Sequence, residues 1–159
     1  MAQQLIDGFG RAINNLRISV TDQCNFRCTY CMPEEGMIFM PRDEILTFEE
    51  ITRFATIAAR LGINKLRLTG GEPTLRKDLP VLVKMLADVP GIDDMAMTTN
   101  GFLLKKMARD LHEAGLPRVN VSIDTLDRQK FKDMTRRDAL EKVLEGLEEA
   151  GKDFSLPIK

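Results

Sequence analysis

The sequence predicts an α/β fold, a partial TIM-like (βα) barrel whose parallel strands form about four complete βα units and the start of a fifth strand. Strand-like and helix-like segments alternate along all 159 residues with no Gly- or Ser-rich linker between them, an order that favours a parallel sheet with right-handed crossovers. In each strand polar residues fall on one of the two alternating sets of positions, whereas the strands of most parallel sheets are almost uniformly apolar. A curved sheet with helices on its convex face and a wide polar-lined interior satisfies both observations.

The first two units begin at segments 16–21 and 66–71, where apolar and polar residues alternate with the period of a strand. Thr47 and Glu50 have the spacing of a capping box, and the apolar repeat after them predicts a helix that ends at a glycine. Apolar positions within 79–86 predict the helix of the second unit.

The third and fourth units repeat this order. Their strands are expected at 95–100 and 119–124, and the helix between those strands at 104–115. Asp138 with Glu141 is expected to cap the last helix. Residues 155–159 are expected to begin the fifth strand.

The charge of the chain is balanced, with 23 Lys and Arg against 24 Asp and Glu and a formal net charge of −1. This excludes a bulk positive field that would recruit nucleic acid or an anionic membrane, so local cations must hold any anionic ligand. No apolar run reaches the roughly 20 residues of a membrane span, and the N-terminus lacks the basic and apolar parts of a signal peptide. We expect a cytoplasmic protein in which residues 1–159 form one domain.

Three cysteines, Cys24, Cys28 and Cys31, follow the first strand with the spacing C-x3-C-x2-C, and the sequence has no others. An odd number of clustered thiols cannot form a distributed disulfide framework. Thiolates select zinc, copper(I) or iron–sulfur clusters, and three on one loop suit a four-iron cluster with one iron lacking a protein ligand. A closed zinc site needs a fourth ligand, and the only histidine, His112, lies in a helical pattern far along the chain. Zinc and incidental thiols remain the alternatives.

This motif, with the aromatic Tyr30 before the last cysteine, resembles that of the radical S-adenosylmethionine (radical SAM) superfamily. The resemblance implies a 4Fe-4S cluster whose open iron binds the amino and carboxylate groups of SAM, and a 5′-deoxyadenosyl radical formed when SAM is cleaved reductively. The Gly-Gly-Glu-Pro segment 70–73 is similar to the part of the family that holds the SAM amino group, where Glu72 can pair with an ammonium. Tyr30, Gly71 and Ser122 match SAM contacts, although a Gly-Gly turn or a strand serine taken alone is more often structural.

Four stretches together resemble a narrower family, the amino-terminal half of the GTP 3′,8-cyclases, which open molybdenum-cofactor (molybdopterin) biosynthesis. The stretches are residues 16–33, 65–76, 97–101 and 119–126. The resemblance implies a lyase that abstracts the ribose 3′ hydrogen of GTP and closes the sugar onto C8, giving 3′,8-cyclo-7,8-dihydro-GTP. It implies cluster ligation by the three cysteines and an electron donor as partner, and it leaves a homodimer open.

The same resemblance implies that GTP is contacted by Arg17, Arg67, Thr98 and Lys159. Cations on the inward positions of neighbouring strands suit a triphosphate, while a solvated charge or an internal ion pair is the alternative for Arg17 and Arg67. Members of the family are about twice as long and carry further cysteines for a second cluster. We therefore expect a truncated chain without that segment. A radical SAM enzyme with another substrate, such as a peptide-modifying maturase, and a catalytically incomplete cluster-binding half-subunit are the alternatives.

Overall fold

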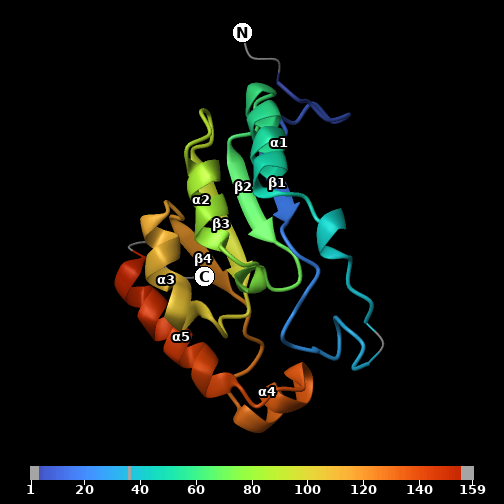
Figure 1. Ribbon diagram of the computed structural model, residues 1–159, viewed down its shortest axis with the longest axis vertical. Coiled ribbons are helices and arrows are strands. Elements are labelled where there is room, and N and C mark those ends of the chain that lie inside the picture. The colour runs from blue at the N-terminus through green and yellow to red at the C-terminus, as the bar shows by residue number, and fades with distance from the viewer. Residues whose placement is uncertain (1–3, 36, 155–159) are drawn as a thin grey trace.

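The computed structural model describes residues 4–35 and 37–154, and this part of the chain forms one four-stranded parallel sheet covered by helices (Figure 1). The strands are β1 (Asn15–Ser19), β2 (Lys65–Thr69), β3 (Asp94–Thr99) and β4 (Arg118–Val121). The helices are α1 (Phe48–Arg60), α2 (Leu79–Ala87), α3 (Leu104–Glu113), α4 (Arg128–Thr135) and α5 (Leu140–Asp153), with short 3-10 turns at Arg42–Glu44 and Pro73–Leu75. None of these helices is long and apolar enough to cross a membrane.

The strand order distinguishes between the two common kinds of parallel sheet. Each strand pairs in parallel with the next one in the sequence, which gives the order β1-β2-β3-β4. A doubly wound sheet reverses its direction at a switch point, whereas a (βα) barrel adds each strand on the same side of the previous one. The predicted partial barrel is therefore confirmed. The fifth strand expected at 155–159 lies outside the described residues.

One face of the sheet forms the core with the helices. Five strand residues on this face are at most 2% exposed, namely Leu66, Leu68, Met95, Met97 and Val119, and Leu16, Ile18 and Val121 are partly buried against the same core. They pack against fully buried helix residues: Leu79, Leu82, Val83, Leu86, Leu104, Ala108 and Leu111. Each large apolar side chain buried in this way contributes roughly 1.5–3 kcal/mol. The opposite face carries the polar side chains of the strands, which are exposed or partly exposed at Arg17, Arg67 and Thr98.

Local signals predicted the start of α1 correctly. Thr47 and Glu50 form the expected capping box, in which Glu50 N donates to Thr47 Oγ1 at 3.2 Å and Thr47 N donates to Glu50 Oε2 at 2.7 Å. Strand ends are earlier than expected: β1 ends at Ser19 and β2 at Thr69, and β4 ends at Val121, so that Ser122 to Asp124 already belong to the following loop.

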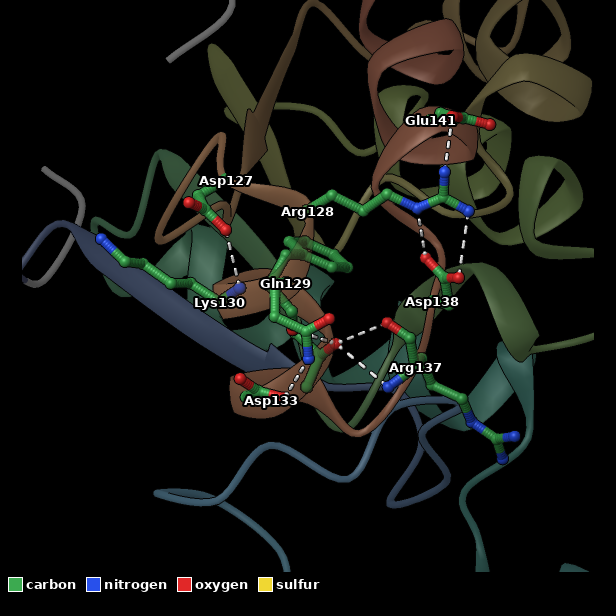
Figure 2. Close-up of polar contacts among 10 residues, drawn as sticks. Asp127, Arg128, Gln129, Lys130, Asp133, Arg137, Asp138 and Glu141 are labelled. Atoms are coloured by element: carbon green, nitrogen blue, oxygen red, sulfur yellow. Dashed lines mark hydrogen bonds and ion pairs between the residues drawn. The ribbon is translucent and has the colours of Figure 1, made fainter.

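The expected cap of the last helix is wrong. The residue before α5 is Ala139, and no side chain caps the helix. Asp138 and Glu141 instead accept hydrogen bonds from Arg128 of α4, with Arg128 Nε 2.9 Å from Asp138 Oδ1 and Arg128 Nη1 3.3 Å from Glu141 Oε1 (Figure 2). The two carboxylates therefore join two helices.

Helix α4 itself was not predicted. Only Phe131 and Thr135 of its eight residues are buried, which is too few for a clear apolar repeat. Its N-terminus does carry a signal, since Asp127 Oδ1 accepts from Lys130 N at 2.9 Å as an N-cap does (Figure 2).

Candidate functional site

The three cysteines lie on the loop that joins β1 to α1, at the carboxyl end of the sheet, where α/β folds bind their ligands. Cys24 and Cys28 are half-buried and Cys31 is exposed. Burial raises the pKa of the Cys24 and Cys28 thiols, and the negative charges of neighbouring groups act in the same direction. A metal that binds here must therefore displace protons.

Helix α4 packs against this loop and accepts hydrogen bonds from it. Arg27 N donates to Thr135 O at 3.1 Å, and Thr29 N donates to Met134 O at 2.8 Å, so the last carbonyls of α4 accept from the loop on both sides of Cys28. The two segments lie at the same end of the molecule in Figure 1. A helix that the sequence pattern did not reveal thus fixes the middle of the cysteine loop.

The Gly-Gly turn after β2 supports the start of the same loop. Gly71 N donates to Thr21 O and Glu72 N donates to Gln23 O, each at 2.7 Å. A Cβ at Gly70 would overlap the Thr21 carbonyl oxygen, and a Cβ at Gly71 would overlap that of Gln23. The absence of side chains at Gly70 and Gly71 permits this close backbone approach, which brings the turn against the backbone that leads to Cys24.

Glu72 has a different role in the structure from the ammonium pairing expected of it. Its side chain is 1% exposed and its carboxylate accepts from Thr74 N at 3.1 Å and Thr74 Oγ1 at 2.5 Å. It also accepts from Thr99 Oγ1 at 2.7 Å and Asn100 N at 2.6 Å. The carboxylate therefore joins the end of β2 to the end of β3.

The residues predicted to contact SAM follow three different strands. The Tyr30 hydroxyl donates to Asp124 Oδ2 at 2.6 Å, and this carboxylate holds the pKa of the Tyr30 phenol above its usual range. Ser122 N donates to Thr99 O at 2.8 Å, and the Ser122 side chain is exposed. Together with Gly71, these residues lie beyond the carboxyl ends of the strands, and Ser122 follows β4 instead of lying within the strand as expected.

The polar face of the sheet carries more cations than acids. Arg17 lies opposite Arg67, and Ala96 lies between Arg67 and Arg118, so the three arginines share one face. Asp94 accepts from Arg67 Nη2 at 2.8 Å and bonds with both oxygens to Arg118 Nη2. Burial opposes ionisation of Asp94, but the two arginines outweigh it and hold the pKa of this carboxyl below its usual range.

The residues predicted to contact the substrate differ in their surroundings. Arg67 makes the internal ion pair that was its alternative, whereas Arg17 is exposed and forms no ion pair within residues 4–35 and 37–154. Thr98 is partly exposed on the same face, and Lys159 lies outside the described residues. Arg118 was missed, although it stands two residues before Asn120 and strand alternation alone places it on this face.

Comparison with known proteins identifies the family. A family model described as the radical SAM superfamily matches residues 18–155. The chain belongs to this superfamily. Its cofactors are accordingly a 4Fe-4S cluster and SAM.

Curated relatives of this radical SAM chain carry the name GTP 3′,8-cyclase. The protein of Aliarcobacter butzleri is 52% identical over 148 residues, which cover 93% of this chain and 46% of the relative. That of Campylobacter jejuni is 54% identical over 146 residues (92% and 46%), and that of Acidothermus cellulolyticus 53% over 164 residues (100% and 45%). The chain spans about half the length of the curated relatives it matches.

Solved structures share the fold of this chain. Methylornithine synthase superposes with a TM-score of 0.71 at 18% identity, covering 91% of this chain and 43% of that one. Streptococcus suis SuiB bound to S-adenosylmethionine superposes with a TM-score of 0.69 at 20% identity, covering 87% and 31%. At this level of identity the likeness supports the architecture alone.

The thiol set fits the cofactor of the radical SAM superfamily. A closed structural zinc site needs four ligands, and the loop supplies three thiols, Cys24, Cys28 and Cys31. What the loop offers is three soft thiols held by α4 and the Gly-Gly turn. Such a set suits a larger iron–sulfur cluster that keeps one iron free of protein ligands.

Proposed function

We propose that the chain is the cluster- and SAM-binding part of a GTP 3′,8-cyclase, a lyase that converts GTP to 3′,8-cyclo-7,8-dihydro-GTP at the start of molybdopterin biosynthesis. The support is the 52–54% identity to proteins of that name over almost the whole chain. Because the chain spans about half of those relatives, the activity of the whole enzyme belongs to the proposal. An electron donor is the implied partner, and the expected location is the cytoplasm.

In this proposal Cys24, Cys28 and Cys31 hold the 4Fe-4S cluster through their thiolates. When bound, the cluster and SAM supply a carbon radical that takes a hydrogen atom from the substrate. The role of the polypeptide is to keep the three thiolates in place. The bonds from Arg27 and Thr29 to α4 do so on the outer side of the loop.

Tyr30, Gly71 and Ser122 are the proposed SAM contacts. Each is tethered to another segment: Tyr30 to Asp124, Gly71 to Thr21, and Ser122 to the end of β3. A ligand that touches all three bridges the carboxyl ends of β1, β2 and β4. These tethers pre-organise the three positions, which lowers the entropic cost of binding SAM.

The excess of cations on the polar face of the sheet is the observation that carries the proposal of an anionic substrate. Arg17 is exposed and available, while Arg67 and Arg118 share the single carboxylate of Asp94. A triphosphate carries several negative charges, which guanidinium groups bind well through paired hydrogen bonds. We propose that Arg17, Arg67, Thr98 and Lys159 contact GTP from this face.

Anaerobic reconstitution with iron and sulfide, followed by equilibrium binding of GTP, tests the proposal. The chain should turn brown with one cluster, and Arg17→Ala should weaken GTP binding by roughly tenfold, since a hydrogen bond to a charged group contributes about 1.5–3 kcal/mol. Arg53→Ala, on the exposed side of α1, is the matched control and should leave binding unchanged. A colourless protein that takes up one zinc ion contradicts the cluster, and equal GTP affinity in all variants contradicts the substrate.

A further inference from the structure

Arg118 lies in the same row of the sheet as two arginines of the proposed substrate site. In the parallel register Arg17 stands opposite Arg67, and Ala96 stands between Arg67 and Arg118. Register partners project their side chains from the same face of a sheet. All three arginines therefore project from the polar face at one level, and the side chain between Arg67 and Arg118 in this row is only a methyl group.

The guanidinium groups of Arg67 and Arg118 converge on one carboxylate. Asp94 Oδ2 accepts from Arg67 Nη2 at 2.8 Å, and Asp94 Oδ1 accepts from Arg118 Nη2 at 2.7 Å. One negative charge thus lies between two positive charges, so the three side chains together keep a net positive charge. The carboxylate also fixes the direction of both guanidinium groups before any ligand binds, which lowers the entropic cost of binding one.

Arg118 has more hydrogen-bond donors available to a ligand than Arg67 has. Both bonds from Arg118 to Asp94 come from Nη2, and the N–H groups of its Nε and Nη1 have no acceptor within residues 4–35 and 37–154. Arg67 uses both of its Nη atoms, since Nη1 donates to Leu66 O at 2.8 Å and Nη2 to Asp94. The side chain of Arg118 is also the more exposed of the two, at 36% against 23%.

We propose that Arg118 is a further contact to the phosphate groups of the substrate, beside Arg67. Its free N–H groups donate to phosphate oxygens while Nη2 remains bonded to Asp94. A guanidinium group can do both, because it carries five N–H donors in a fixed plane. The inference rests on the proposed function, since it takes GTP as the ligand of the polar face, and it adds β4 to the strands that bind the triphosphate.

Equilibrium binding of GTP to the reconstituted chain tests the contact. Arg118→Ala should weaken GTP binding by roughly tenfold, because it removes hydrogen bonds from a charged donor. The same substitution in an Asp94→Asn background separates a direct contact from neutralisation of the Asp94 charge: the loss should persist there, and a loss that disappears overturns the inference. The matched control is Arg11→Ala, since Arg11 also pairs with an aspartate, Asp7, but lies outside the four-stranded sheet. The control should bind GTP as the parent does, and an equal loss in it overturns the inference.

A measurement on the unsubstituted chain covers the case in which a variant does not fold. Phenylglyoxal modifies accessible arginines, and mass spectrometry of the digested chain gives the rate at each one. GTP and inorganic triphosphate should slow the modification of Arg118 severalfold, whereas guanosine should not, and Arg11 should react at one rate throughout. Protection of Arg17 without protection of Arg118 overturns the inference and leaves the proposed function standing. If the chain binds no GTP and neither arginine is protected, the proposed function and the inference fail together.

Discussion

The Tyr30 hydroxyl of the cysteine loop donates a 2.6 Å hydrogen bond to Asp124, a residue 94 positions later that follows the last described strand. This bond closes the loop across the carboxyl end of the sheet. The loop is thus held at three places: at its start, where Thr21 O and Gln23 O accept from Gly71 N and Glu72 N; near its middle, by α4; and at Tyr30, by Asp124.

Removal of this bond should loosen the loop without unfolding the chain. For Tyr30→Phe we expect faster amide hydrogen exchange at residues 24–31. The free energy of unfolding should change by less than about 1 kcal/mol, since the tyrosine side chain is exposed. Asp124→Asn retains an acceptor oxygen and serves as the control. Equal exchange in Tyr30→Phe and the parent would show that the bond does not restrain the loop.

The buried carboxylate of Glu72 should be important for stability. Glu72→Gln replaces one acceptor oxygen by an NH2 group that faces other donors, so we expect a loss of about 1–3 kcal/mol in the free energy of unfolding, measured by urea denaturation. Glu49→Gln, on the first turn of α1 and exposed, should change it by less than about 0.5 kcal/mol. Similar values for the two variants would contradict a structural role for Glu72.

The Gly-Gly turn should not tolerate a side chain. Gly70 has a φ of +135° and no room for a Cβ beside Thr21 O, so Gly70→Ala should destabilise the fold by more than about 1 kcal/mol and disturb the cysteine loop. Gly151→Ala in α5 meets open space and should be neutral or stabilising by up to about 1 kcal/mol. Thermal denaturation of the two variants measures the difference. Equal melting temperatures would contradict the close packing of turn and loop.

Asp94 should make stability depend on acidic pH. Its folded pKa lies below the unfolded value of about 3.9 because Arg67 and Arg118 bind the carboxylate against the effect of burial. Its contribution is therefore fully present above the unfolded pKa and lost as the pH falls through the folded pKa. In Asp94→Asn the free energy of unfolding should decrease less steeply as the pH falls below about 4. Urea denaturation at successive pH values measures this slope. An unchanged slope would mean that other carboxyl groups dominate acid unfolding.

Features that depend on neighbours in sequence were predictable. The capping box of Thr47 and Glu50 and the alternation along β2 follow from local geometry, and the cysteine spacing indicated the site directly. The cap expected at Asp138 and Glu141 failed because Arg128, on another helix, competes for both carboxylates. Pairing of this kind is long-range and leaves no local pattern.

For the functional site, too, only the features that depend on local sequence were predictable. Arg118 could have been found from strand alternation, since it precedes Asn120 by two residues. The partners of Glu72 could not, because they arrive from the end of β3 through the register of the folded sheet. The contact of α4 with the cysteine loop was missed for the same reason, because it consists of two backbone hydrogen bonds and the packing of Phe131 against Phe26, a residue more than 100 positions earlier.

The contact between α4 and the cysteine loop implies that the cofactor binds only after α4 has been synthesised. Arg136 bonds to the carbonyl of Arg27, 109 residues earlier, so the ribosome must complete α4 before the loop can take its final shape. Until then α4 does not pack against the cysteine loop, and the thiols are accessible to oxidants that attack exposed cysteines. We therefore expect iron and sulfide to enter after α4 has docked, and a nascent chain arrested before residue 128 to retain no cluster.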